Sequence, residues 1–288
     1  MLGETLQLNL FNLTFSKRYL ENWTTTRRRR SNTYTSFLFC GVDVALVLAI
    51  LIAFYHFGVK SVFAVRHLDV DCGDISIREK FHENTVSSLH LLAVTLGVPF
   101  LTIGLCCLAN NFNKTHKYGY GIVLAQTTFH YINFLFIFFV MTVLLEAVKC
   151  GVGRHRPHFI DVCKADLSVC ETDPNATIKN IVCDTTDKQA RNIRTSFPSG
   201  HSAAAVFSLY YVFSFLEYQF KATSNTSKSI KSFVLIVLAA WTIFCCGTRV
   251  TDKWHHQTDV IAGIIFGFIL SVGLTNSCSK QVPLLKEE

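Results

Sequence analysis

The sequence has few charged residues, and this scarcity excludes most soluble folds. Only 16% of its 288 residues are Asp, Glu, Lys or Arg, whereas 50% are hydrophobic and 25 are phenylalanine. A soluble domain of this length normally carries a larger polar fraction. The composition therefore predicts a membrane protein.

Three further absences narrow the class. The first thirty residues contain no apolar core followed by a small-residue cleavage site, so we expect no cleavable signal peptide and a first span that acts as a signal anchor. Residue 2 is leucine, which argues against N-myristoylation. No Cys-x-x-Cys spacing indicates a zinc site. We expect neither a metal nor an organic cofactor.

Six apolar runs are long enough to cross a bilayer, which takes about 20 residues. They cover residues 36–59, 88–109, 120–148, 201–220, 232–247 and 258–275. The arginine run at 27–30 directly precedes the first of them and, by the positive-inside rule, places both termini in the cytoplasm. The predicted fold is an all-α integral membrane bundle of six transmembrane helices. The net charge of +7 does not indicate nucleic-acid binding, because the arginine run would face anionic inner-leaflet lipids.

This topology places loops at about 60–87, 149–199 and 248–257 on the exoplasmic face. Of the five Asn-x-Ser/Thr sequons only Asn175 falls in such a loop, so we expect a glycan there alone. Oxidising conditions on this side permit disulfides. The loop cysteines are Cys72, Cys163, Cys170 and Cys183. The sequence leaves their three possible pairings open.

A basic cluster follows the third span. It runs from Lys149 to Pro157 and includes Arg156. Side chains snorkelling to the membrane surface would give the same pattern, but glycines within the cluster would let the backbone approach a ligand. Glu146, three residues before Lys149, is placed to pair with it.

A second cluster, from Ser196 to His201, leads into the fourth span. Pro198 and Ser199 favour a helix start, and the free amides of a helix N-terminus attract phosphate. A histidine in a first turn is more often a capping or interface residue. The presence of the other clusters on the same side of the membrane favours a chemical role for His201.

The third cluster is a polar stretch at 247–259, between the last two apolar runs. Arg249, His255 and Asp259 follow one another at spacings of five and three intervening residues. If a helix begins near His255, then His255 and Asp259 lie on one face, where the carboxylate can hold the imidazole. The alternative is a short solvated hairpin.

Together the clusters supply the groups that phosphate transfer needs. Lys149, Arg156 and Arg249 match the charge of a phosphomonoester, about −1.5 to −2. One histidine can attack phosphorus while the other protonates the leaving alkoxide.

The motifs Lys-x6-Arg-Pro at 149–157, Pro-Ser-Gly-His at 198–201 and Arg-x5-His-x3-Asp at 249–259 resemble those of the type 2 phosphatidic acid phosphatase superfamily. The flanking residues resemble its lipid phosphate phosphatase branch, and the likeness covers about residues 36–275. One departure is Thr248, where the family usually has serine; the hydroxyl is retained.

The resemblance implies a role for each matching residue. His255 would be the nucleophile that forms a phosphohistidine, Asp259 would orient it, and His201 would be the proton donor. The residues implied to bind phosphate are Lys149, Arg156, Ser199, Gly200 and Arg249. His256 is an adjacent alternative nucleophile, but only His255 has both motif spacings.

The resemblance also implies magnesium-independent hydrolysis of phosphatidate, lysophosphatidate, sphingosine 1-phosphate and ceramide 1-phosphate, in phospholipid metabolism and signalling. Residues 1–35 would be a cytoplasmic arm, 36–275 the phosphatase domain and 276–288 a cytoplasmic tail. We expect the plasma membrane, with the endoplasmic reticulum or other endomembranes as alternatives. A non-enzymatic lipid-binding protein and a headgroup transferase are the competing functions. The preferred lipid and any homo-oligomer are left open.

Overall fold

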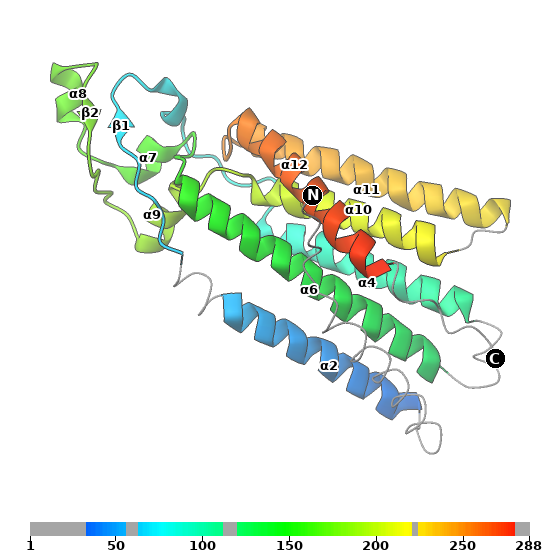
Figure 1. The fold of residues 1–288 in the computed structure, drawn as a ribbon. Helices are drawn as coiled ribbons and strands as arrows, with labels where there is room; N and C mark the ends of the chain where they lie inside the picture. Colours follow the sequence, from blue (N-terminus) through cyan, green and yellow to red (C-terminus); the bar gives the residue numbers. More distant parts are fainter. Residues whose placement is uncertain (1–32, 56–62, 112–119, 221–223, 280–288) are drawn as a thin grey trace, which may run out of the picture.

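The computed structural model describes residues 33–55, 63–111, 120–220 and 224–279. Residues 1–32 of the predicted arm (1–35) and residues 280–288 of the predicted tail (276–288) lie outside these ranges. Within the described ranges, six long helices run side by side (Figure 1). They are α2 (Thr33–Ala53), α4 (Ser88–Asn110), α6 (Gly121–Val152), α10 (Gly200–Gln219), α11 (Asn225–Thr251) and α12 (Gln257–Ser279).

Within the described residues, four helices are long and apolar enough to cross a membrane: α4, α6, α11 and α12. The part of α2 from Val44 to Ala53 forms a shorter apolar segment, and α10 is not among the four. The all-α membrane architecture is therefore supported, while the count of six spans stays a prediction. The position of α10 accounts for its more polar sequence, because α4, α6, α11 and α12 pack around it and replace lipid as its surroundings.

Glycines allow α12 to approach α10 closely. A Cβ at Gly263 would lie 2.5 Å from the carbonyl oxygen of Ser199, and one at Gly267 would overlap the backbone of Ala203. Small residues spaced by four positions let two membrane helices touch backbone to backbone. This contact sets the first turn of α12 directly against the start of α10.

Two helix ends position the basic cluster at 149–157 and the cluster at 196–201. Helix α6 extends beyond its predicted end at 148 to Val152, so Lys149 lies within the last turn. It stops at Gly153, whose φ of 67° is left-handed and where the backbone of Arg66 occupies the space of a Cβ. Helix α10 starts with Ser199 as its N-cap, accepting from the backbone N–H of Ser202, which confirms the predicted helix start.

A small cap covers one end of the bundle (Figure 1). It contains β1 (Val70–Asp71), η2 (Ile75–Ile77), α7 (Phe159–Cys163), α8 (Ser168–Thr172), β2 (Thr177–Ile178) and α9 (Asp187–Ile193). Strands β1 and β2 pair antiparallel, so the fold includes a two-stranded ribbon that the all-α prediction lacked. The cap has its own apolar core, centred on Phe159 and Ile193.

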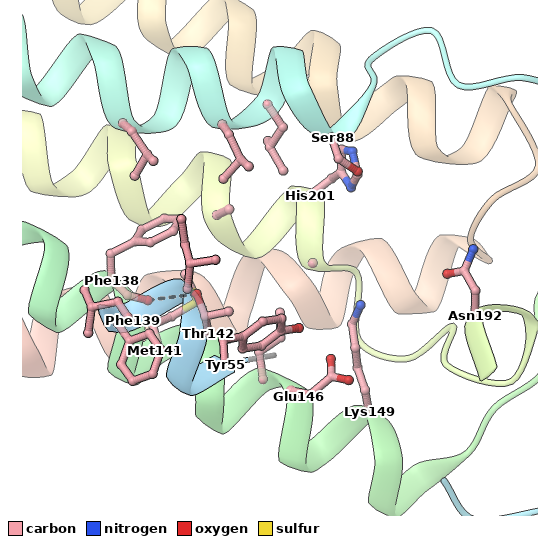
Figure 2. Close-up of a pocket in the computed structure, with 18 of the residues that line it drawn as sticks. Tyr55, Ser88, Phe138, Phe139, Met141, Thr142, Glu146, Lys149, Asn192 and His201 are labelled. Atoms are coloured by element: carbon pink, nitrogen blue, oxygen red, sulfur yellow. Dashed lines mark hydrogen bonds between the residues drawn. The ribbon is translucent and has the colours of Figure 1, made fainter. Parts of the chain in front are cut away.

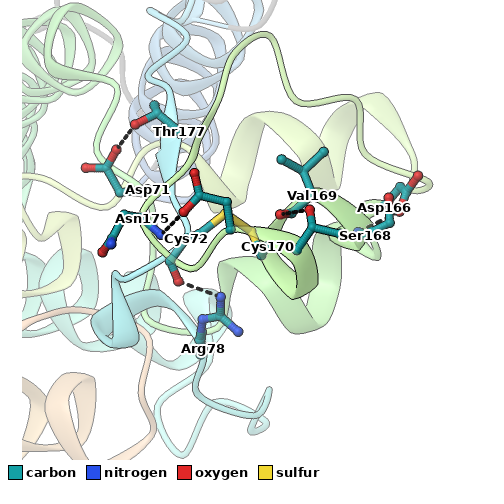
Figure 3. The surroundings of a disulfide bond; sticks show 11 residues. Asp71, Cys72, Arg78, Asp166, Ser168, Val169, Cys170, Asn175 and Thr177 are labelled. Atoms are coloured by element: carbon teal, nitrogen blue, oxygen red, sulfur yellow. Dashed lines mark hydrogen bonds between the residues drawn. A yellow bond between two sulfur atoms is a disulfide. The ribbon is translucent and has the colours of Figure 1, made fainter.

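Two disulfides close the cap. The structure pairs Cys72 with Cys170 and Cys163 with Cys183, selecting one of the three pairings that the sequence left open. Around the first bond, Arg78 donates to the backbone oxygen of Cys72 over 2.8 Å (Figure 3). The first disulfide therefore joins the 63–87 segment to the 153–199 segment, and the second closes a loop within the latter.

Candidate active site

A cavity of about 630 Å³ opens between the bundle and the cap. Its inner part is lined by apolar side chains of α2, α4 and α6, among them Leu48, Leu96 and Phe138. Its outer part, toward the cap, is polar, and Figure 2 shows Lys149 extending there from α6 toward the start of α10. The cavity is therefore amphipathic along its length.

The structure brings most of the predicted site residues into this cavity. Those that line it are Lys149, Arg156, Gly200, His201, Arg249 and His255. Ser199 and Asp259 are fully buried and are not among the lining residues. Asn175 lies on the exposed surface of the cap, away from the cavity.

Gly200 leaves room for the lysine of the preceding motif. A Cβ at Gly200 would lie 3.2 Å from the Lys149 Nζ. Any side chain at this position would press on the ammonium group. The start of α10 and the end of α6 thus place a backbone amide and a cation at one point of the cavity.

One imidazole nitrogen of His201 makes no hydrogen bond to the described residues. The side chain hydrogen-bonds to the backbone of Val86, and its buried Nε2 has no hydrogen-bond partner among the described residues. Buried polar atoms are normally satisfied. Because His201 lines the cavity, its Nε2 is placed to hydrogen-bond to a ligand bound there.

Asparagines hold both arginines of the predicted clamp. Arg156 donates from Nε to the backbone oxygen of Asn192 over 2.8 Å and from Nη2 to its Oδ1 over 2.9 Å. Arg249 donates from Nη1 to Asn84 Oδ1 over 2.6 Å. Its Nε and Nη2 also donate to Thr248 Oγ1, which gives the retained hydroxyl a positioning role. Each guanidinium is therefore fixed before a ligand arrives.

His255 is deeply buried, with 3% of its side chain exposed. It precedes α12, which starts at Gln257, so the helix begins near the histidines as supposed but includes Asp259 and not His255. Its backbone N–H donates to the Arg249 carbonyl instead, and this bond fixes the loop. Burial, followed by the charge of Arg156, lowers the pKa of His255 well below 6.5. The imidazole is therefore neutral, as a nucleophile must be.

Asp259 holds His255 less directly than predicted. The distance from His255 Nδ1 to Asp259 Oδ2 is 3.9 Å, which is too long for a hydrogen bond. The hydroxyl of Ser196 lies between them, donating to Asp259 Oδ2 over 2.6 Å and lying 3.4 Å from His255 Nδ1. His256 also contacts this carboxylate, through its Nδ1 at 3.1 Å and its backbone N–H at 3.0 Å.

Arg154 completes the surroundings of Asp259. Its Nη1 lies 2.6 Å from Asp259 Oδ1 and compensates the buried charge. Arg154 and Ser196 both stand inside the motif regions, yet the motif spacings gave neither a role. Asn84 and Asn192 carry no sequence signal of function, and only the folded chain brings them to the arginines.

Trp254 covers the outer edge of the site. The guanidinium carbon of Arg156 lies 4.9 Å from the centre of its ring, within range of a cation–π contact. Its Nε1 donates to the backbone oxygen of His82 over 2.8 Å. The 63–87 segment is thereby attached to the 247–259 stretch.

Among the described residues, no group of three or more His, Cys, Asp or Glu side chains is arranged to hold a metal ion.

Comparisons with known proteins agree with these motifs. The model of the PAP2 superfamily matches residues 130–282. The chain is 28% identical over 248 residues to a Drosophila melanogaster protein named as a candidate phosphatidate phosphatase, covering 72% of this chain and 60% of that one. It is 28% identical over 214 residues to phospholipid phosphatase 1 of Rattus norvegicus, covering 70% and 72%. With phospholipid phosphatase 2 of Bos taurus it shares 27% identity over 202 residues, covering 69% of each.

The chain spans less than two thirds of the length of the fly relative and somewhat more of the two mammalian ones. No solved structure matches it.

Proposed function

The chain belongs to the PAP2 superfamily, and from this premise we propose that it is a lipid phosphate phosphatase that hydrolyses phosphate monoesters of membrane lipids. The single observation that carries this proposal is the amphipathic cavity, whose polar end holds two histidines and three cations and whose inner part is apolar. A lipid phosphate has the same two parts, a charged phosphate group and apolar hydrocarbon chains. The names of the relatives, phosphatidate phosphatase and phospholipid phosphatase, support the same activity.

In the proposed reaction, His255 is the nucleophile. Its Nδ1 faces Ser196 and Asp259, which leaves Nε2 to attack phosphorus. The bond between phosphorus and the lipid oxygen breaks as His201 gives a proton to that oxygen. The lipid alcohol leaves, and a phosphohistidine remains. Water then attacks phosphorus while His201 takes its proton; the bond between phosphorus and His255 Nε2 breaks, and inorganic phosphate is released.

Fixed positive charge stabilises the transition state in this scheme. Lys149, Arg156 and Arg249 surround the polar end and are held by the protein, so little reorganisation is needed as negative charge develops. The amide of Gly200, next to Lys149, adds a donor at the start of α10. We propose that these groups make magnesium unnecessary.

The membrane arrangement belongs to the same proposal. The six long helices would span the bilayer, with the cap and the cavity mouth on the exoplasmic side and both termini in the cytoplasm. The two cap disulfides fit an oxidising compartment, and the exposed position of Asn175 fits a glycan. The plasma membrane remains the expected location.

The test is phosphate release from phosphatidate in mixed micelles containing EDTA. We expect turnover by the purified protein and a loss of at least about 1,000-fold for His255→Ala, because the covalent route is removed. His256→Ala is the matched neighbour and should retain far more activity. Full turnover by His255→Ala would refute the nucleophile, and no release by the wild type from any lipid phosphate would refute the function.

A further inference from the structure

Two asparagines line the polar end of the cavity, one beside each of its arginines. They are Asn84, from the 63–87 segment, and Asn192, from α9. Figure 2 shows Asn192 at the cap end of the cavity, the end toward which Lys149 extends. Neither asparagine belongs to the three motifs, and Asn84 precedes the region that the family model matches. Both side chains are half-buried.

The arginines determine which way each asparagine amide points. A guanidinium can only donate, so the asparagine atom that faces it is the carbonyl oxygen. Arg249 Nη1 donates to Asn84 Oδ1 over 2.6 Å, and Arg156 Nη2 donates to Asn192 Oδ1 over 2.9 Å. The other end of each amide is therefore the NH2 group, which can only donate. Neither NH2 group has a hydrogen-bond partner among the described residues.

The arginines themselves have few N–H groups left for a ligand. A guanidinium carries five N–H groups. Arg249 makes four hydrogen bonds to the protein, and Arg156 makes three. A phosphate group presents three strong acceptor oxygens. Donors that lie beside the arginines therefore find acceptors on a phosphate bound there.

The chain next to Asn84 is anchored to the 247–259 stretch. The backbone N–H and the hydroxyl of Thr85 each donate to Asp252 over 2.8 Å. Asp252 also pairs with Arg249, so the asparagine, its arginine and this carboxylate form one unit. The amide of Asn84 is therefore held in place before a ligand binds, and little reorganisation is needed on binding.

The chain next to Asn192 is anchored to α6. Its neighbour Arg191 pairs with Glu146 over 2.9 Å, whereas the sequence had suggested Lys149 as the partner of that carboxylate. Asn192 also accepts from Arg156 at its backbone oxygen over 2.8 Å, in addition to the bond at Oδ1. The amide of Asn192 is therefore held beside its arginine as well.

Resting on the proposed function, we propose that Asn84 and Asn192 are further phosphate-binding residues, each of which donates its side-chain NH2 group to a phosphate oxygen beside its arginine. The guanidinium at Oδ1 polarises the amide and strengthens its N–H groups as donors. A neutral amide also adds a donor without adding repulsion to a site that already holds three cations.

The first variants are Asn84→Ala and Asn192→Ala, assayed for phosphate release from phosphatidate. We expect each to lose roughly 10- to 100-fold in kcat/KM, the effect of removing a hydrogen bond to a charged group. Asn110→Ala is the matched control, because the side-chain amide of Asn110 donates to the Gln219 carbonyl over 2.8 Å and does not line the cavity. This control should match the wild type.

The same loss would follow if the asparagines only held their arginines, and a double-mutant cycle separates the two causes. In an Arg249→Met background Asn84 has no guanidinium to hold, and Asn192 has none in an Arg156→Met background. We expect Asn84→Ala or Asn192→Ala to lower kcat/KM by a further factor of roughly 5 or more in the matching background, because the bond from NH2 to phosphate is still lost.

A further loss below about 2-fold would overturn the proposal for that asparagine and leave it the single task of holding its arginine. If an arginine variant has no measurable turnover, the dissociation constant of orthovanadate takes the place of kcat/KM. Calorimetry on the same four proteins in detergent measures it, and the same factors decide. Failure of the proposed function looks different, because the wild type would release no phosphate while the vanadate cycle would still show whether the NH2 groups bind an oxyanion.

Discussion

Helices α10 and α12 touch backbone to backbone at Gly263 and Gly267, and the bundle they belong to is held mainly by apolar packing. The cap has a small apolar core and depends instead on two disulfides and a two-stranded ribbon. The candidate site lies where these two parts meet. The bundle helices α6 and α11 carry Lys149 and Arg249, whereas Arg156 and the asparagines that hold both arginines come from the segments at the cap end.

This division explains how the site can hold several like charges close together. Arg156 is anchored by Asn192 and Trp254 on the cap side, and Arg249 is anchored by Asn84, which comes from the 63–87 segment. That segment lies outside the region matched by the family model. The account therefore predicts effects of different size when the site, the cap and the bundle are altered separately.

The largest loss of activity among these changes should come from replacing Arg156, the arginine on the cap side of the site. Arg156→Gln removes a cation that lowers the pKa of His255. Without it the protonated imidazole is less disfavoured, so the pKa of His255 rises and the acid limb of the kcat/KM profile moves to higher pH. We also expect kcat/KM at its optimum to fall about 10- to 100-fold, because charged hydrogen bonds to phosphate are lost.

The pH profile of the remaining activity is the measurement. Arg78→Gln is the control, because Arg78 donates to the backbone of Cys72 in the cap and does not line the cavity. An acid limb that stays in place or moves to lower pH in Arg156→Gln would contradict the electrostatic coupling.

The cap disulfides should differ in their contribution to stability. Replacing Cys72 and Cys170 by alanine opens a loop of 98 residues, and replacing Cys163 and Cys183 opens one of 20. In the chain-entropy account each loss costs about 2–4 kcal/mol, with the longer loop costing about 1 kcal/mol more. Amide hydrogen exchange of the cap should be faster in the first double variant, and the reverse order would argue against this account.

A smaller loss of stability is expected from a substitution between two helices of the bundle. Gly263→Ala places a methyl group against the Ser199 backbone and should destabilise the α10–α12 contact by about 1–3 kcal/mol. It should also lower kcat, because the backbone N–H of Ser199 donates to the Asp259 carbonyl over 2.9 Å. Gly247→Ala is the matched control, since a Cβ there meets no atom within 4 Å. The measurements are the thermal unfolding temperature in detergent and kcat for both variants. Equal unfolding temperatures and equal kcat values for Gly263→Ala and Gly247→Ala would contradict the close contact between α10 and α12.

The sequence predicted those features that depend on local chemistry. Ser199 begins α10 because a serine hydroxyl caps a helix start, and the apolar runs became the long helices because their residues need burial. The cysteine pairing and the role of Ser196 could not be predicted, because they depend on which distant segments meet. The spacing of His255 and Asp259 suggested direct contact, but the helix starts two residues after His255, and Ser196 occupies the space between them.

We propose that His255, and not the adjacent His256, carries the phosphate during turnover. Both imidazoles lie near Asp259, and His256 makes the shorter contact, 3.1 Å against 3.9 Å. Only His255 lines the cavity. The most direct test quenches turnover of a lipid phosphate in alkali, where phosphohistidine survives, and locates the phosphate by fragmentation of the peptide that contains both residues. We expect the phosphate on His255. Phosphate on His256, or on neither histidine during steady turnover, would rule out His255 as the nucleophile.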